Sequence, residues 1–357
     1  MRVFKALGEI LAPYEKLGLI NSSAYPEDLP ILRISSPQHA IEGDLVFVWE
    51  QKALSELIQT DASCLIVSEA LVEFLPVTSG RPVILTPKAD LLLAYIYRDL
   101  GREVMGQAKE SASLIHPTAV IGENCTIPDS CRIGAYSQIG SNVTLSRNVE
   151  IGPHVVVEDD CDIGEETYIE AFVFVGRETK IGRRVHIQPS SVIGSEGFGF
   201  AFDERAYHRL PHLGNVVIED DVAIGAQCAV DRAKFDSTRI GRGTKLDNQC
   251  HIAHNVSIGE DSVITAQFCV AGSTKIGDRF RASGQTAIHP HLEIADDVNL
   301  AFRAGVTDSI ETKGTYAGLP LVPLNQYLKY STHLKKLPEM KKDLRRFDRR
   351  ISSLEGE

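Results

Sequence analysis

The chain has 357 residues, of which 43% are hydrophobic and 24% charged, with a formal net charge of −11 at pH 7. This length suits a globular protein of two or three domains, and the acidic balance argues against nucleic acid as a general partner. No apolar run approaches the ~18 residues that span a bilayer, so at most a peripheral membrane contact is expected. Seven cysteines without a CxxC pair, and no signal peptide, favour a cytoplasmic location.

Residues 1–107 are expected to form a small α/β domain. Their hydrophobic pattern predicts strands at 44–49 and 82–85 and helices at 52–59 and 90–100. A polar linker follows at 106–113, which is rich in small and charged residues.

Residues 108–316 carry a different pattern, in which a branched residue recurs every six positions. A period of six fits neither a helix nor simple strand alternation, and it is typical of a parallel β-helix whose branched residues point inward. Position 282 is an exception, because it holds Ala. The repeat positions are Ile121, Ile127, Ile133, Ile139, Leu145, Ile151, Val157, Ile163, Ile169, Val175, Ile181, Ile187 and Ile193, then Ile240, Leu246, Ile252, Ile258, Ile264, Val270, Ile276, Ile288, Ile294, Leu300 and Val306.

Two segments interrupt this repeat. Residues 195–213 form a long aromatic and Gly-rich loop, and residues 231–238 form a short one. Insertions in a solenoid leave from its corners and often lie on the binding face, although a drift of the repeat without any role is the alternative. Five cysteines occupy a slot that is otherwise Ser, Thr or Val, which predicts a structural role: Cys125, Cys131, Cys161, Cys228 and Cys250.

Residues 317–357 are expected to be a C-terminal helical extension. A heptad-like seam runs through Leu337, Met340, Leu344, Phe347, Ile351 and Leu354, and is too short to hold an oligomer alone. Basic residues flank it, so that residues 329–357 carry nine Lys and Arg against five Asp and Glu, while 1–328 carry 28 against 43. Either this face is merely solvated, or it receives an acidic partner.

The segment DNQCHIAHNV (247–256) contains the strongest candidate for chemistry. One coil is 18 residues, so His254, two places after the inward Ile252, stacks against Gly272, and Pro290 between His289 and His291 follows. An outer wall with an imidazole, a Gly backbone and a second imidazole offers a general base, an oxyanion-binding N–H and a polar clamp. A hydrogen-bonding bystander is the alternative role for a lone surface histidine.

Several segments resemble the UDP-3-O-acylglucosamine N-acyltransferases of lipid A biosynthesis. They are DNQCHIAHNV, the loop GSEGFGFAFDERAYHRLPHLGNV (194–216), AVDRAKFDSTRIGRGTKLDNQ (229–249) and GLPLVP (318–323). The resemblance implies a homotrimer, in which each chain joins an N-terminal uridine-binding domain, a left-handed β-helix and C-terminal helices. It also implies transfer of a 3-hydroxyacyl chain from acyl carrier protein to the 2-amine of a UDP-3-O-acyl-glucosamine.

The resemblance assigns roles by position. His254 would be the general base, the Gly272 N–H would bind the oxyanion, and Asp247 would orient or polarise the site. His291, Asn248 and His251 would bind substrate, and the acyl ruler would fall at or near Gly305. No permanently bound cofactor or metal is implied, only the phosphopantetheine arm of the carrier. That acidic carrier would dock on Lys341, Lys342, Arg345, Arg346, Arg349 and Arg350.

The chain departs from the family where uridine would bind. The family's Phe is present as Phe47, but Glu50 and Ala53 replace an Asn and an aromatic residue, so Trp49 is the remaining candidate to stack on the base. In the β-helix, His251 and His212 stand where Gln is common, and Ala233 replaces a Gly. A divergent member, or a paralogue with another sugar acceptor, is therefore a further hypothesis.

Three alternatives remain at this stage. The first is a coenzyme A-dependent sugar acetyltransferase on the same fold. The second is a zinc carbonic anhydrase, which would use His251, His254 and His289 or His291 at a subunit interface. The third is a non-catalytic β-helix that acts in scaffolding or binding, although it gives no reason for the long loop and the imidazoles to share one wall.

Overall fold

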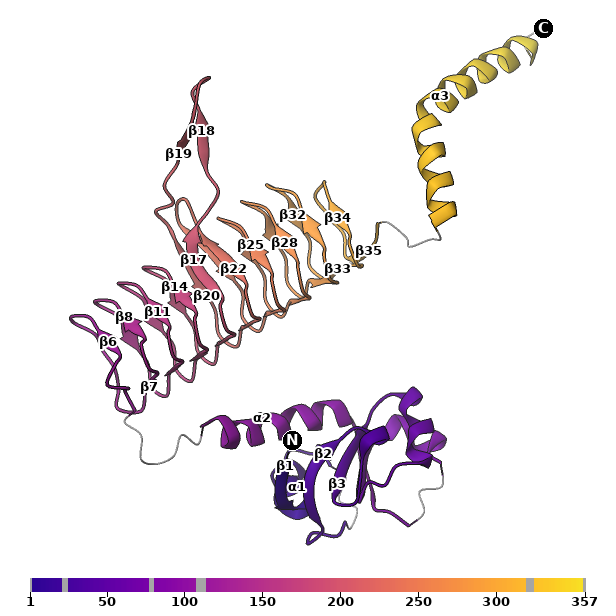
Figure 1. The fold of residues 1–357 in the computed structure, drawn as a ribbon. Helices are drawn as coiled ribbons and strands as arrows, with labels where there is room; N and C mark the ends of the chain where they lie inside the picture. The colour runs from indigo at the N-terminus through magenta and orange to yellow at the C-terminus, as the bar shows by residue number, and fades with distance from the viewer. Residues whose placement is uncertain (1, 21–24, 77–79, 107–113, 319–323, 356–357) are drawn as a thin grey trace. The chain divides into compact units, whose positions relative to one another are not determined.

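The computed structural model describes residues 2–20, 25–76, 80–106, 114–318 and 324–355 (Figure 1). The chain divides into two compact units, Met1–Ala112 and Ser113–Glu357, each with its own hydrophobic core. The predicted boundary at 107/108, most of the linker at 106–113 and most of the GLPLVP motif lie outside the described residues.

The first unit is an α/β domain, as predicted. Strand β1 pairs antiparallel with β2, and β2 to β5 run parallel in the order β1-β2-β3-β4-β5. The predicted helix at 52–59 is a 3₁₀ helix instead of an α-helix. The elements are β1 (Arg2–Ala6), α1 (Leu7–Glu15), β2 (Pro30–Ser35), η1 (Pro37–His39), β3 (Asp44–Val48), η2 (Gln51–Ile58), β4 (Cys64–Ser68), η3 (Glu69–Phe74), β5 (Val83–Thr86) and α2 (Ala89–Gly106).

The second unit contains the predicted parallel β-helix, whose coils stack with a register of 18 residues where no insertion intervenes (Figure 1). Each regular coil contributes one short strand to each of three walls, and each wall is a parallel β-sheet. The first wall contains β7 (Arg132–Ile133), β10 (Glu150–Ile151), β13 (Tyr168–Ile169), β16 (His186–Ile187), β21 (Ala223–Ile224), β24 (Lys245–Leu246), β27 (Val263–Ile264), β30 (Arg281–Ala282), β33 (Val298–Leu300) and β35 (Gly314–Tyr316).

The second wall contains β6 (Val120–Ile121), β8 (Gln138–Ile139), β11 (Val156–Val157), β14 (Phe174–Val175), β17 (Val192–Glu196), β22 (Ala229–Arg232), β25 (His251–Ile252), β28 (Cys269–Val270), β31 (Ala287–Ile288) and β34 (Gly305–Val306). The third wall contains β9 (Thr144–Leu145), β12 (Asp162–Ile163), β15 (Lys180–Ile181), β20 (Asn215–Ile218), β23 (Ser237–Ile240), β26 (Ser257–Ile258), β29 (Lys275–Ile276) and β32 (Glu293–Ile294). The first corner joins the first and second walls, the second corner joins the second and third, and the third corner leads back to the first wall.

The core confirms that the residues of the six-residue repeat point inward, since those from Ile133 to Leu300 are almost completely buried. Where Ala282 takes a repeat position, the rings of Phe268 and Phe280 fill the interior with centroids 6.1 Å apart. Four of the five repeat cysteines are buried, and Cys125 is partly buried, which agrees with their structural interpretation.

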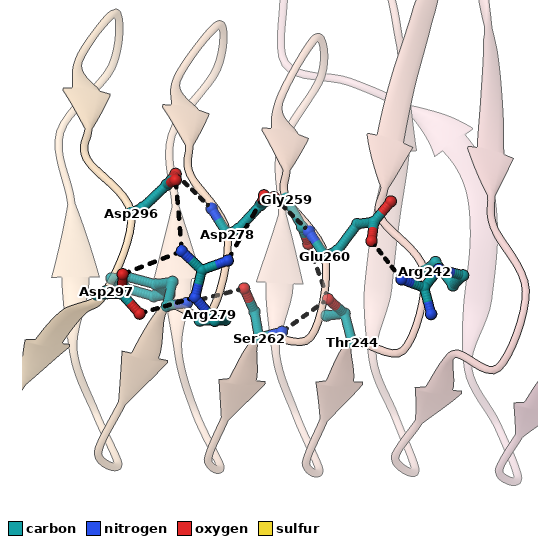
Figure 2. A network of polar contacts seen from close by, with 10 residues as sticks. Arg242, Thr244, Gly259, Glu260, Ser262, Asp278, Arg279, Asp296 and Asp297 are labelled. Carbon is teal, nitrogen blue, oxygen red and sulfur yellow. Dashed lines mark hydrogen bonds and ion pairs between the residues drawn. The ribbon is translucent and has the colours of Figure 1, made fainter.

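Polar side chains at the third corner tie one coil to the next (Figure 2). Asp278 accepts the Glu260 N–H at 2.8 Å, and Asp296 accepts the Asp278 N–H at 2.9 Å. Arg279 donates to Asp297 at 2.8 and 3.0 Å. Asp278 and Asp296 thereby satisfy backbone N–H groups that would otherwise lack an acceptor.

Both interruptions leave the second corner, and the longer one ends in a hairpin. Its strands are β18 (Phe200–Phe202) and β19 (Tyr207–Arg209), which pair antiparallel and project from the β-helix (Figure 1). The chain ends in α3 (Leu324–Glu355), a single helix that contains Pro338. No helix of the described residues is long and apolar enough to cross a membrane.

Candidate active site

His254 lies at the second corner, with its imidazole directly over Gly272 of the next coil. A Cβ atom at position 272 would come within 2.7 Å of both Cε1 and Nε2 of His254. Only glycine leaves room for the ring there. The stacking expected from the 18-residue coil therefore brings these two residues together, helped by the Ser273 N–H, which donates to the His254 carbonyl at 3.0 Å.

Asn255 fixes the tautomer of His254. Its Oδ1 accepts the Lys234 N–H at 2.9 Å, and its Nδ2 donates to the Phe235 carbonyl at 2.8 Å, so the amide orientation is determined by the backbone. The same Oδ1 lies 3.1 Å from His254 Nδ1. Nδ1 must therefore carry the proton, which leaves the Nε2 lone pair over Gly272 as the basic atom.

The backbone N–H of Gly272 has no acceptor within the described part of the chain. Elsewhere in the β-helix the N–H two places after an inward residue is often capped by a side chain of a neighbouring coil. Asp247 accepts the Ala266 N–H at 3.1 Å, and Asp278 accepts that of Glu260. At Gly272 this donor stays available beside the imidazole, where it can bind a negatively charged oxygen.

His212, from the base of the hairpin, packs against His254 with ring centroids 4.9 Å apart. Its Nδ1 lies 3.0 Å from the Leu210 carbonyl and donates to it, while its buried Nε2 has no hydrogen-bond partner among the described residues. Burial, then the nearby His254 and Lys234, lowers the pKa of His212, so the ring is neutral near pH 7.

Asp231 is a buried carboxylate of the same cluster. The sequence repeat did not reveal it. Its Oδ1 accepts the Ser195 hydroxyl at 2.9 Å, and its Oδ2 lies 3.7 Å from His251 Nε2. Burial raises the pKa of Asp231, while Ser195 and the neighbouring histidines oppose that rise. Asp231 lies in the short interruption of the repeat, so counting coils does not locate it.

Asp247 and Asn248 lie at the first corner and do not reach His254 within one chain's coil. Asp247 accepts the N–H groups of Asn248 and Ala266, and Asn248 Oδ1 accepts the Ala226 N–H at 2.7 Å. His291 is exposed at the second corner, where its own N–H donates to the Gly272 carbonyl at 3.1 Å. The functional roles of these residues remain predictions.

Small side chains continue down the second wall from His251. Cys269, Ala287 and Gly305 follow it in register on successive strands. A Cβ atom at Gly305 would have no neighbour within 4 Å. This outward-facing column of small residues leaves space beside the wall for an extended apolar ligand.

Comparisons with known proteins match both the repeat region and nearly the whole chain. A family model described as the GMPPB C-terminal domain matches residues 109–197, and one for the bacterial transferase hexapeptide (six repeats) matches 237–267. The UDP-3-O-acylglucosamine N-acyltransferase of Methylococcus capsulatus is 35% identical over 98% of both chains. The Pseudomonas syringae enzyme of the same name is 34% identical over 92% of this chain and 91% of its own.

The chain belongs to the UDP-3-O-acylglucosamine N-acyltransferase family. It is therefore an acyltransferase. A solved Arabidopsis UDP-N-acetylglucosamine acyltransferase is similar to this chain at 24% identity, over 58% of this chain and 70% of its own, with a TM-score of 0.48.

In this family member, the first unit contains a cavity of about 490 Å³ where the sequence pointed to a base-binding site. Phe47 lines it but is 5% exposed, whereas Trp49 is 43% exposed and Tyr97, from α2, 41%. Glu50 is paired with Lys52 at 2.6 Å. Tyr97 was missed because α2 is remote in sequence from β3, although it offers a second ring beside Trp49.

No three His, Cys, Asp or Glu side chains of the described residues converge as a metal site. Around His254, the ring of His212 packs on the imidazole, Asp231 accepts the Ser195 hydroxyl, and Asn255 engages His254 Nδ1.

Proposed function

We propose that the chain transfers a 3-hydroxyacyl group from acyl carrier protein to the 2-amine of a UDP-3-O-acyl-glucosamine, in lipid A biosynthesis. One observation carries the proposal: His254 has a fixed Nδ1–H, and its Nε2 lies beside Gly272, whose N–H has no acceptor among the residues that the structure describes. A base next to an oxyanion donor suits attack by an amine on an acyl carbonyl.

The reaction needs no covalent enzyme intermediate. The amine nitrogen bonds to the thioester carbonyl carbon as His254 Nε2 takes its proton. The Gly272 N–H donates to the oxyanion that forms, and the carbon–sulfur bond then breaks. The His254 imidazolium gives the proton to the departing thiolate of the phosphopantetheine arm, so His254 ends the cycle neutral.

Neighbouring residues take supporting roles in this proposal. His291, His251 and Asn248 bind polar groups of the acceptor. Asp247 orients or polarises the site, and its place at the first corner means that it would act across a subunit boundary in a homotrimer. The acyl chain lies along Cys269, Ala287 and Gly305, where small side chains leave room.

The nucleotide and the carrier have separate candidate sites. Phe47 and Trp49 line the first-unit cavity that would hold uridine, and Tyr97 adds a ring that can replace the aromatic residue lost at Ala53. The carrier is acidic, so the basic residues of α3 are its proposed landing surface. Of these, Lys342, Arg345, Arg346, Arg349 and Arg350 line one shallow depression. Use of acyl carrier protein as the donor would require the chain to lie in the cytoplasm with that carrier.

Loss of the base tests the proposal. The wild-type chain is expected to acylate the 2-amine, and His254→Ala to reduce turnover by about 10²–10⁴-fold, the usual cost of losing a general base. The fold should survive, because the imidazole lies outside the core.

His291→Ala should raise the KM for the sugar nucleotide more than it lowers kcat.

The matched control is His116→Ala, an exposed histidine near the start of the β-helix. It should keep wild-type turnover. Near-normal activity of His254→Ala would rule out this mechanism.

A further inference from the structure

A second cavity, of about 420 Å³, opens at the base of the hairpin next to His254. Its lining includes Arg177, Arg209, Arg232, Glu158, Glu196 and His212. Because His212 also packs on the His254 ring, only one imidazole separates this cavity from the proposed base. The mechanism above assigns nothing to it.

Arg232 is a buried cation in this lining. It is 6% exposed, its Nε donates to the Gly214 carbonyl at 2.7 Å, and its Nη2 donates to the Arg177 carbonyl at 3.1 Å. No carboxylate among the described residues pairs with it. A buried guanidinium whose hydrogen bonds go only to carbonyl oxygens retains its charge and favours a bound anion.

Arg177 adds a second positive charge to the same lining. Burial of Arg232 and then the positive charge of Arg177 lower the Arg232 pKa, while the charges of Glu178 and Glu158 oppose that fall, so Arg177 lies within electrostatic reach of Arg232. Arg177 is exposed, and no carboxylate of the described chain forms an ion pair with it. Two unpaired guanidiniums at one cavity match a dianion.

The carboxylates that line the cavity are already engaged. Glu158 accepts the Arg177 backbone N–H at 2.9 Å. Glu196 pairs with Arg209 and accepts the His212 backbone N–H at 3.2 Å. Neither forms an ion pair with Arg232, although Glu158 acts on its charge from a greater distance. The buried Nε2 of His212 is a further polar atom of the lining without a partner in the described chain, and it can accept a ligand hydroxyl.

We propose that this cavity is an anion subsite, in which Arg177 and Arg232 bind the diphosphate of the nucleotide-sugar acceptor. The assignment rests on the proposed function. In a nucleotide sugar the diphosphate is attached to C1, the carbon next to the amine-bearing C2, which agrees with a cavity one imidazole away from His254. The phosphate of phosphopantetheine is separated from the reacting thioester by the whole pantetheine arm, which disfavours it as the occupant.

Binding of inorganic pyrophosphate to the full-length chain, measured by calorimetry, tests the subsite without any acyl transfer. Arg177→Gln should weaken it by roughly 10- to 100-fold, the loss expected for hydrogen bonds to a charged group. Arg205→Gln, at the exposed tip of the hairpin, is the matched control and should bind as the wild type does. Equal affinity in wild type and Arg177→Gln, or no binding to either, overturns the proposal.

Arg232→Lys gives a second measurement, because it keeps the charge but loses the forked donor. It should also weaken pyrophosphate binding. Since Arg232 donates to the Gly214 carbonyl at the hairpin base and to the Arg177 carbonyl, this variant can unfold the hairpin, and the exposed Arg177 then decides the matter alone.

Competition identifies the source of the phosphate. UDP should displace pyrophosphate, whereas 4′-phosphopantetheine should not; the reverse order would assign the cavity to the donor arm and overturn our assignment. In the transfer assay, Arg177→Gln should raise the KM for the sugar nucleotide and leave the KM for the carrier unchanged. Pyrophosphate binding that depends on Arg177 in a chain without transferase activity would contradict the proposed function and not the subsite.

Discussion

Gly305 leaves the second wall without a side chain where the proposed acyl groove continues. Each buried methylene of an acyl chain is worth about 0.8 kcal/mol, so a residue that blocks the groove should change the preferred length measurably. We expect Gly305→Met to shift preference toward shorter donors, because the new side chain occupies the space of the last methylenes. Competition between carrier-bound donors of different lengths measures this.

Arg147→Met is the control, since Arg147 is exposed at the third corner, away from the second wall and from the corner that carries Asp247. It should keep the wild-type preference. If Gly305→Met keeps that preference as well, the length limit lies elsewhere, and the exposed ring of Phe302 is the next candidate.

Single residues differ in how far the sequence could predict them. His254 and Gly272 meet because no insertion separates their coils, so counting 18 residues sufficed. Asn255 follows His254 directly in the sequence, so its contact with the imidazole was also predictable. Asp231 and His212 reach the cluster through the two interruptions, which the repeat does not describe. Trp49 was expected beside the first-unit cavity, but Tyr97 arrives from α2, whose packing no periodicity encodes.

Among the elements, the coils were predictable because their six-residue period follows directly from inward-facing side chains. The hairpin was not, since residues 195–213 carry no repeat, although their aromatic content marked them as an insertion. The heptad seam of α3 predicted a helix correctly, and the structure forms it as one element despite Pro338.

The basic face of α3 has a testable purpose. Reversing Arg345, Arg346, Arg349 and Arg350 to Glu should raise the KM for the carrier-bound donor severalfold, mainly through slower association, with kcat and sugar-nucleotide affinity little changed. Each exposed pair contributes only about 0–1 kcal/mol, so the effect should be collective and weaken with salt. Steady-state kinetics at several ionic strengths measure it.

A carrier KM and salt dependence that survive this reversal would reduce α3 to an oligomerisation helix with a solvated face. The charge-neutral quadruple replacement by Gln separates attraction from repulsion. It should give a smaller increase in KM than the Glu variant.

For the whole molecule, we expect a homotrimer with the active site between subunits. A nearly flat wall offers little concavity for an acyl chain, whereas two facing walls form a groove, and a three-sided coil supports threefold packing. Asp247, held at the first corner, also needs a second subunit to approach His254. Light scattering should give three times the 39.2 kDa mass of the chain. A monomer at working concentration would contradict this assembly.

The most direct test of the account is the identity of the product that the wild-type chain makes. With 3-hydroxyacyl carrier protein and UDP-3-O-acyl-glucosamine, mass spectrometry should find a new amide at the 2-amine. Acetyl coenzyme A as donor, or UDP-N-acetylglucosamine as acceptor, should give no comparable product. Efficient acetyl transfer, or acylation of a hydroxyl in place of the amine, would contradict the function proposed for this chain.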